Sequence, residues 1–433
     1  MPQKPQKTAK DKVTKSHPTT PIKKTHTGPK QSPQLAHASK TAAHFGFVEY
    51  NNLEIEKQDI SKAKNFKDGI LAKKSVLETN ALDFEGYLEE KIAIIRHYIE
   101  KKMIDLSQPP MIYYEGPIEG NPHIKKREKT FNIDIIGNGK SISDAIVIET
   151  ACAILKDLNP ESNLLVEINS IGDKDSFNRF SREYVNYYKK HMNELPAEER
   201  QAFKKNPLDV LMSTHETCQH LNNEAPHPMD YLSEESRDQF REVLEYIESL
   251  NIAYSINHCL MGNGSFCSGT IFRILNIIDT EESEEREVCA IGERYNIVAR
   301  KAWGKKEVPA IGASIILDEK ALAGNHKSLK SPAQSKKAKD IRFFFIQLGY
   351  DARLKSLTII NMLRGANIHV HQSLSRDKIS AQLAAAEKID AHYLLIVGQK
   401  EAIDNSVTIR HMNTLVQETI EIAKLIGYLK DLM

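Results

Sequence analysis

The spacing of apolar residues along the chain predicts most of its helices and strands. Apolar side chains recur every three to four positions over residues 84–102, 143–158 and 233–250, which is the period of a helix with one buried face. Residues 112–117 and 131–137 instead alternate, and they flank a turn rich in Gly, Pro and Asn, so they predict a β-hairpin. Residues 164–173 predict a further strand, and residues 174–204 predict surface-facing helix.

Strands and helices alternate beyond residue 340. We expect strands at residues 343–349, 368–370, 393–398 and 407–410. We expect helices at residues 351–363, at 375–388 with Ser375 as the cap, and at 414–430. This alternation predicts an α/β domain over residues 341–433 with a mainly parallel sheet. Residues 321–340, which are rich in Lys, Ser, Gly and Ala, are expected to link it to the rest.

Length and cysteine content narrow the class of protein. A chain of 433 residues has room for two or three domains. No run of apolar residues is long enough to span a membrane, and no apolar signal-peptide core follows the N-terminus. The five cysteines are scattered and form no zinc-type spacing, so we expect reduced thiols, no metal site and a cytoplasmic protein.

The net charge of +1 hides an asymmetry between the N-terminus and the rest of the chain. Residues 1–40 hold nine lysines and six prolines against a single acid, Asp11, and almost no bulky apolar side chains. Such a segment cannot bury enough surface to offset its ordering entropy, so we expect a disordered basic arm over residues 1–40. A lysine-rich arm attracts phosphate backbones, although it would serve equally well as a solubilising tail.

The stretch from residue 206 to residue 273 carries the most distinctive order of motifs. It begins with Asn-Pro-Leu at 206–208 and passes through Ala-Pro at 225–226 and Asp-Tyr-Leu at 230–232. A predicted helix capped by Ser233 follows, and the stretch ends with Gly-Thr-Ile-Phe at 269–272. This order resembles the middle of a histidyl-tRNA synthetase, a class II aminoacyl-tRNA synthetase.

The resemblance extends over about residues 41–433. It includes Phe-Gly-Phe at 45–47, Gly-Glu-Arg-Tyr-Asn at 292–296 and Val-Pro-Ala-Ile-Gly at 308–312. It implies an α+β class II synthetase-like core over residues 41–320, built on an antiparallel sheet flanked by helices, with a helical insertion at about 174–250. Residues 314–320 would begin a helix of that core. It further implies an anticodon-binding-like domain at 341–433, a homodimer and tRNA as partner.

Three positions depart from the family pattern where that family has arginines that act on ATP. The residues that stand there are Tyr113, Gly262 and Glu319. Loss of one such preorganised contact typically costs about 3–4 kcal/mol of transition-state stabilisation. The resemblance therefore implies a catalytically impaired paralogue, with no cofactor expected. Only Glu115 on the first hairpin strand matches a functional family position.

Two other functions stay open. A divergent but active histidine–tRNA ligase would use ATP and Mg²⁺, and would need Lys125, Lys126, Arg127 or Arg294 to replace the lost charge. A regulatory subunit of histidine biosynthesis would resemble family members that usually lack the C-terminal domain, which this chain has. The residues expected to line the substrate pocket are Glu115, Lys126, Arg127, Phe266, Ser268, Arg294 and Tyr295. Those expected to contact RNA are Arg364, His369, His371 and Arg410.

Overall fold

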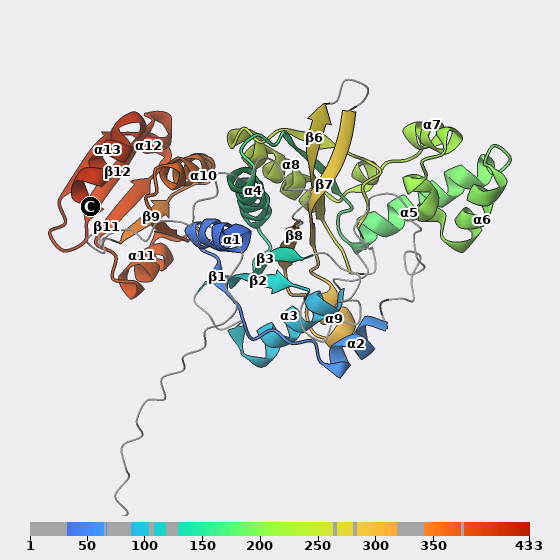
Figure 1. Cartoon of the computed structure of the whole chain (residues 1–433), viewed down its shortest axis with the longest axis horizontal. Helices are drawn as coiled ribbons and strands as arrows, with labels where there is room; N and C mark the ends of the chain where they lie inside the picture. The colour runs from blue at the N-terminus through green and yellow to red at the C-terminus, as the bar shows by residue number, and fades with distance from the viewer. Residues whose placement is uncertain are drawn as a thin grey trace, which may run out of the picture. The chain divides into compact units, whose positions relative to one another are not determined.

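A mixed eight-stranded sheet forms the centre of the larger domain (Figure 1). The computed structural model describes residues 33–64, 66, 88–103, 108–117, 129–262, 266–279, 284–317, 342–373 and 376–433. In sheet order the strands are β1 (Val48–Glu49), β2 (Met111–Gly116), β3 (Thr130–Ile136), β8 (Ala310–Ile316), β7 (Glu284–Arg294), β6 (Thr270–Asp279), β4 (Leu164–Ser170) and β5 (Tyr254–Ile256). The pairs at the two edges, β1 with β2 and β4 with β5, are parallel, and the pairs between them are antiparallel.

The two faces of this sheet differ because successive side chains of a strand point to opposite sides. We call the side that carries Ile133 and Phe272 the back face, and the side that carries Asp134 and Glu293 the front face. The back face is apolar and packs against the helices α1 (Pro33–His44), α4 (Ser141–Leu158) and α8 (Glu234–Ser249). Figure 1 shows α1 beside α4.

A second helical layer covers the front face over β2, β3 and β8. It consists of α3 (Leu88–Glu100), α2 (Lys57–Lys64) and α9 (Val298–Trp303), which are grouped below the β2–β3 hairpin in Figure 1. Apolar side chains of α3, including Ile92 and Ile95, pack against Ile112 and Tyr114 of β2. The sheet is therefore enclosed on both sides in this region.

The helical insertion follows β4. Its elements are α5 (Lys174–Lys190), α6 (Ala197–Lys205), α7 (Glu216–Glu224) and the short 3₁₀ turns η5 (Pro207–Met212) and η6 (Pro228–Tyr231). The expectation that residues 174–204 face the solvent is wrong for one side of α5. Phe180, Tyr184 and Tyr188 recur at i, i+4 and i+8 and are buried in a separate core of the insertion.

The C-terminal domain has a five-stranded sheet of order β10-β9-β11-β12-β13. Its elements are β9 (Phe343–Gln347), α10 (Tyr350–Gly365), β10 (Val370–Gln372), α11 (Ile379–Lys388), β11 (Tyr393–Val397), α12 (Gln399–Ile403), β12 (Ser406–His411), β13 (Gln417–Glu421) and α13 (Ile422–Leu432). The expected alternation is confirmed as far as β12. The sheet is mixed, however, since β12 and β13 pair antiparallel.

The structure corrects four of the predicted elements. Residues 33–40 belong to α1 and not to the basic arm, because Leu35, Ala38 and Ala42 form a buried stripe of small apolar side chains. Residues 314–316 end strand β8 and do not begin a helix, since they pair with β3 and β7 on both sides. Residues 417–421 form β13, where Thr419 and Ile420 favour a strand, and the last helix begins only at Ile422.

The fourth correction is the start of the helix expected at residues 375–388. That helix, α11, begins at Ile379, and Ser375 lies outside the described residues. The predicted link at 321–340 and the arm at 1–32 also lie outside them. The cap at Ser233 is confirmed, because its side chain accepts a hydrogen bond from the Ser236 backbone N–H. Within the described residues, no helix is both long enough and apolar enough to cross a membrane.

Candidate functional site

Two buried carboxylates lie in one row on the front face, with a glycine on the strand between them. In the register of the sheet, Asp134 of β3 lies opposite Gly312 of β8, and Gly312 lies opposite Glu293 of β7. Both carboxylates are at most 5% exposed. Gly312 is required between them, because a Cβ at this position would overlap Asp134 Oδ1. The result is a buried acidic row across three neighbouring strands.

Lys91 of α3 supplies the positive charge that this row needs. Its Nζ donates to Asp134 Oδ1 at 2.7 Å and lies 4.9 Å from the centre of the Tyr295 ring. The Tyr295 hydroxyl donates to the same Asp134 oxygen at 2.7 Å. All three side chains are buried, so each of these polar contacts is made away from water.

Burial raises the pKa of both carboxylates on the row. The pKa of Asp134 lies above its ordinary value because of desolvation, which the charge of Lys91 and the hydrogen bonds from Lys91 and Tyr295 partly oppose. Desolvation likewise raises the pKa of Glu293 to about 7, against the opposing charge of Lys91. The row can therefore exchange a proton near neutral pH.

Tyr113 and Glu115 do not belong to this site. Both alternate onto the back-face side of β2, whereas Ile112 and Tyr114 face the front. Tyr113 is buried and stacks on Phe131 with ring centroids 5.2 Å apart, and Glu115 is exposed. Glu115, which was expected in the substrate pocket, therefore lies on the opposite side of the sheet from the acidic row, and so does Tyr113.

Arg294 is also placed differently from its expected role. It follows Glu293 on β7 and is turned toward the start of α4, where its Nε donates to both Asp144 oxygens at 2.8 and 3.0 Å. Its guanidinium also donates to the Lys140 carbonyl at 2.9 Å. Both Arg294 and Asp144 are fully buried. Arg294 is therefore an internal cross-link between the sheet and a helix, whereas the Tyr295 side chain reaches Asp134 on the front face.

The remaining pocket candidates lie beside Glu293 or outside the described residues. Phe266 is buried against Tyr295 and α9, and Ser268 is half-buried. A Cβ at Gly262 would lie 2.8 Å from Glu293 Oε2 and 2.7 Å from the Cys267 sulfur, so a larger side chain has no room there without movement. Lys125, Lys126, Arg127 and Glu319 lie outside the described residues.

Three of the four expected RNA contacts gather where the C-terminal domain meets α1 and α4. Arg364 donates to both Asp157 oxygens at 3.0 and 2.9 Å, so its charge is already paired. The His369 ring lies 5.6 Å from that of His44 and 4.7 Å from that of His371. Arg410 lies apart from them on β12, opposite Leu394. Of the two arginines, Arg364 is paired with Asp157, whereas Arg410 is half-buried and forms no ion pair within the described residues.

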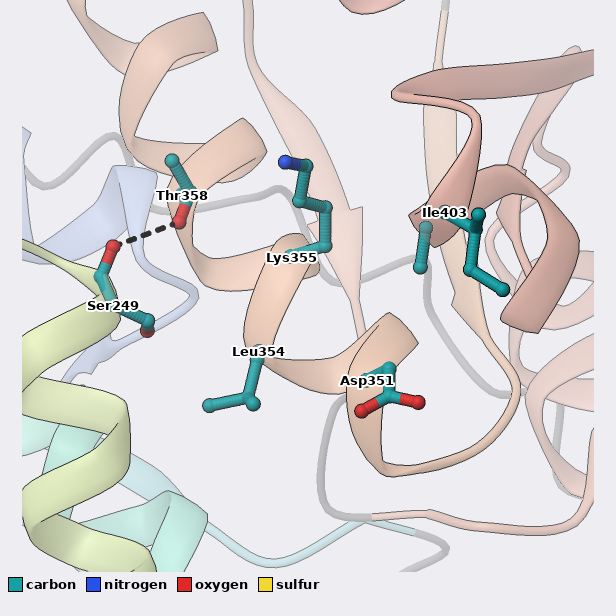
Figure 2. Close-up of a pocket in the computed structure, with 7 residues that line it drawn as sticks. Ser249, Asp351, Leu354, Lys355, Thr358 and Ile403 are labelled. Carbon is teal, nitrogen blue, oxygen red and sulfur yellow. Dashed lines mark hydrogen bonds between the residues drawn. The ribbon is translucent and has the colours of Figure 1, made fainter.

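A hollow lies between α8, α10 and α12 (Figure 2). It has a volume of about 430 Å³ and combines apolar residues such as Leu354 and Ile403 with one side chain of each charge, Asp351 and Lys355. Thr358 donates to the Ser249 carbonyl at 3.2 Å along its edge. Among its described lining residues, no acidic and basic side chains are in contact. We therefore interpret the hollow as a groove between packed helices and not as a reaction site.

Lys91, Asp134 and Glu293 were not predicted as site residues from the sequence. A partial signal was present in the second hairpin strand, where Asp134 and Asn132 are the polar positions of the alternating run at 131–137. The partner of that aspartate lies 43 positions away on α3, and no local pattern indicates the pair.

The comparisons with known proteins agree with this architecture. Residues 346–432 match the family model described as an anticodon binding domain. The histidine–tRNA ligase of Halothermothrix orenii is 26% identical over 402 residues, which cover 89% of this chain and 93% of that protein. The enzyme of the same name from Listeria monocytogenes is 28% identical over 337 residues, or 77% of each chain.

A solved structure has the same fold along nearly the whole chain. The apo histidyl-tRNA synthetase of S. aureus superposes with a TM-score of 0.50 and 22% identity, and the match covers 96% of this chain and all of that one. Proteins named histidine–tRNA ligase or histidyl-tRNA synthetase thus match both the core and the C-terminal α/β domain of this chain. Along both its core and its C-terminal domain, the chain is similar to histidyl-tRNA synthetases.

Proposed function

We propose that this chain is a catalytically impaired member of its family that binds tRNA or another RNA and serves as a dimeric scaffold. The observation that carries the proposal is the charge balance of the front face. The basic side chains that contact its buried carboxylates are all paired: Lys91 with Asp134, and both Arg273 and Arg286 with Glu167, at 2.6 and 3.4 Å. Glu293, the remaining carboxylate of the acidic row, forms no ion pair within the described residues, and no uncommitted cation stands beside it there.

The carboxylates of the acidic row would oppose a triphosphate placed beside them. Two like charges 4 Å apart repel by about 1 kcal/mol in water and about 4 kcal/mol near a protein surface. Arg294, which was expected to supply a positive charge, is instead committed to Asp144. Adenylation of an amino acid requires stabilisation of charge on phosphorus, and these described side chains do not offer it.

The C-terminal domain supports the RNA-binding half of the proposal. It matches an anticodon binding domain over residues 346–432, so tRNA is the natural partner to test. Arg410 on β12 is the side chain we assign to RNA contact, because Arg364 is held by Asp157. Phosphate contacts of this kind weaken steeply with added salt.

Histidine-dependent ATP–pyrophosphate exchange tests the impairment. The purified chain is compared with an active histidine–tRNA ligase in the same buffer, and its fold is checked by circular dichroism. We expect no exchange above the background measured without histidine. Exchange that requires histidine would refute the impairment. Filter binding of tRNA over a salt series tests the second half, and an affinity no higher than that of a neutral protein would refute it.

A divergent active ligase is the alternative, and one observation favours it. Relatives named histidine–tRNA ligase match 89% of this chain, which includes both the core and the C-terminal domain. Such an enzyme would bind ATP and Mg²⁺, with Lys125, Lys126 or Arg127 in place of the missing arginines. A regulatory role in histidine biosynthesis is a weaker alternative, because the chain has kept the anticodon-binding domain.

A further inference from the structure

We propose that a basic surface formed by the end of α2, by α9 and by the turn after α9 binds the phosphate backbone of a nucleic acid. The inference rests on the RNA-binding half of the proposed function and adds a contact surface on the core to the one in the C-terminal domain. Residues 61–64 and 300–306 hold no acidic side chain. Their six basic side chains, which we call the α2–α9 surface, are Lys62, Lys64, Arg300, Lys301, Lys305 and Lys306.

Two lysines join α2 to α9, which lie next to each other in Figure 1. Lys62 Nζ donates to the Ala302 carbonyl at 2.6 Å and lies 4.9 Å from the centre of the Trp303 ring. In the opposite direction, Lys301 Nζ lies 5.5 Å from the centre of the ring of Phe66, just past the end of α2. Contacts between an ammonium and an aromatic face hold both charges in place, and a preorganised charge loses less entropy when a ligand binds.

The charge of the α2–α9 surface is opposite to that of the molecule around it. The whole chain has 59 basic and 58 acidic side chains, and residues 1–32 hold eight lysines and one aspartate. This leaves 51 basic against 57 acidic side chains over residues 33–433. A cluster of six cations on an acidic body is therefore a local feature, and it is not explained by the overall composition.

The cations of this surface are crowded and mostly without counter-ions. Of the six, Arg300 alone forms an ion pair in the described part of the chain, with Glu307 at 2.5 Å. Burial and the charges of Arg300 and Lys174 lower the pKa of Lys301. Crowded like charges repel one another in the free protein, and a polyanion that binds there relieves the repulsion.

The side chains around these cations favour a nucleic acid over an anionic membrane. Surfaces that bind a bilayer combine cations with exposed bulky apolar side chains that enter it. Over the described residues, none of the large apolar side chains that are exposed lies on α2 or α9. Trp303 is half-buried and lies against Lys62. Clustered lysine and arginine side chains without an apolar anchor bind phosphates irrespective of base sequence.

Trp303 is the only tryptophan of the chain, so its fluorescence reports on this surface. The full chain is titrated with a labelled single-stranded oligouridylate of about 20 nucleotides, and Trp303 fluorescence is followed together with the anisotropy of the label. The test variant combines Lys301→Gln, Lys305→Gln and Lys306→Gln. The control variant removes the same charge from exposed positions of α5 and α6 and combines Lys189→Gln, Lys190→Gln and Lys205→Gln. Both variants keep the lysines of residues 1–32.

We expect Trp303 fluorescence to change as the unaltered chain binds the RNA. The test variant should bind at least about tenfold more weakly at low salt, and its slope of log affinity against log salt should be shallower by about 2, because each phosphate contact on a single strand contributes about 0.7. The control variant should bind within about twofold of the unaltered chain. RNA binding with no change at Trp303, or an equal loss of affinity in the two variants, would overturn the inference. A change at Trp303 with phosphatidylserine vesicles and none with the RNA would overturn it as well.

A parallel titration with tRNA separates this inference from the proposed function. If Arg410→Ala weakens tRNA binding while the test variant binds oligouridylate as the unaltered chain does, the α2–α9 surface is refuted and the contact in the C-terminal domain is retained. An unaltered chain that binds neither RNA would refute both. Pyrophosphate exchange that requires histidine would refute the proposed impairment alone, since it does not depend on these lysines.

Discussion

Replacement of Arg294 by methionine separates a structural arginine from a substrate-binding one. The guanidinium makes hydrogen bonds to both oxygens of Asp144, at 2.8 and 3.0 Å from Nε, and to the Lys140 carbonyl. Neither charged partner is exposed to solvent. Arg294→Met would therefore leave a carboxylate buried with no counter-ion.

The expected cost follows from that burial. Removal of one partner of a buried ion pair typically destabilises a protein by about 3–5 kcal/mol, since the remaining charge is uncompensated. This is a large part of the about 5–15 kcal/mol that holds an ordinary domain together. Arg294→Met is compared with Arg300→Met, which breaks the half-exposed pair of Arg300 with Glu307 and should cost less than about 1 kcal/mol.

The free energy of unfolding is measured by urea titration, with the fluorescence of the single tryptophan, Trp303, and far-UV circular dichroism as independent probes. A double variant, Arg294→Met with Asp144→Leu, should recover much of the loss because it removes the stranded charge. If Arg294→Met costs no more than Arg300→Met but abolishes binding of ATP, the structural role argued for Arg294 is wrong.

Three further predictions concern other parts of the chain. Burial raises the pKa of Glu149 from 4.5 to about 8. The stability that the protonated Glu149 contributes is therefore lost as pH rises from about 4.5 to about 8, and Glu149→Gln should stabilise the chain by up to about 3 kcal/mol at pH 7. A series of thermal denaturations over pH in which both proteins lose stability in parallel would contradict this. Ser233→Ala should cost about 1 kcal/mol in urea titrations, because its hydroxyl caps α8, and an unchanged midpoint would show that the cap contributes nothing. Arg410→Ala should weaken tRNA binding and reduce the slope of log affinity against log salt by about 1, and an unaltered slope would place the RNA elsewhere.

The order of elements followed largely from local pattern and from family resemblance. Periods of two and of three to four residues identified the β2–β3 hairpin, α4, α8 and the strands of the C-terminal domain, because each pattern reflects which side of a single element meets the core. Errors arose where local signals were weak or mixed. The alanine-rich start of α1 resembled the polar arm before it, and β13 adjoins a helix without any break in its apolar spacing.

The site was decided by tertiary structure. A shift of one residue moves a strand's side chains to the opposite face of the sheet, and the sequence of β2 does not say whether Tyr113 or Tyr114 faces the front. Pairs that define the site and its surroundings are distant in sequence: Lys91 and Asp134 are 43 residues apart, and Asp144 and Arg294 are 150 apart. Their charges meet only because the sheet register and the helical layers bring them together, and a buried charge is stable only where that packing supplies its partner.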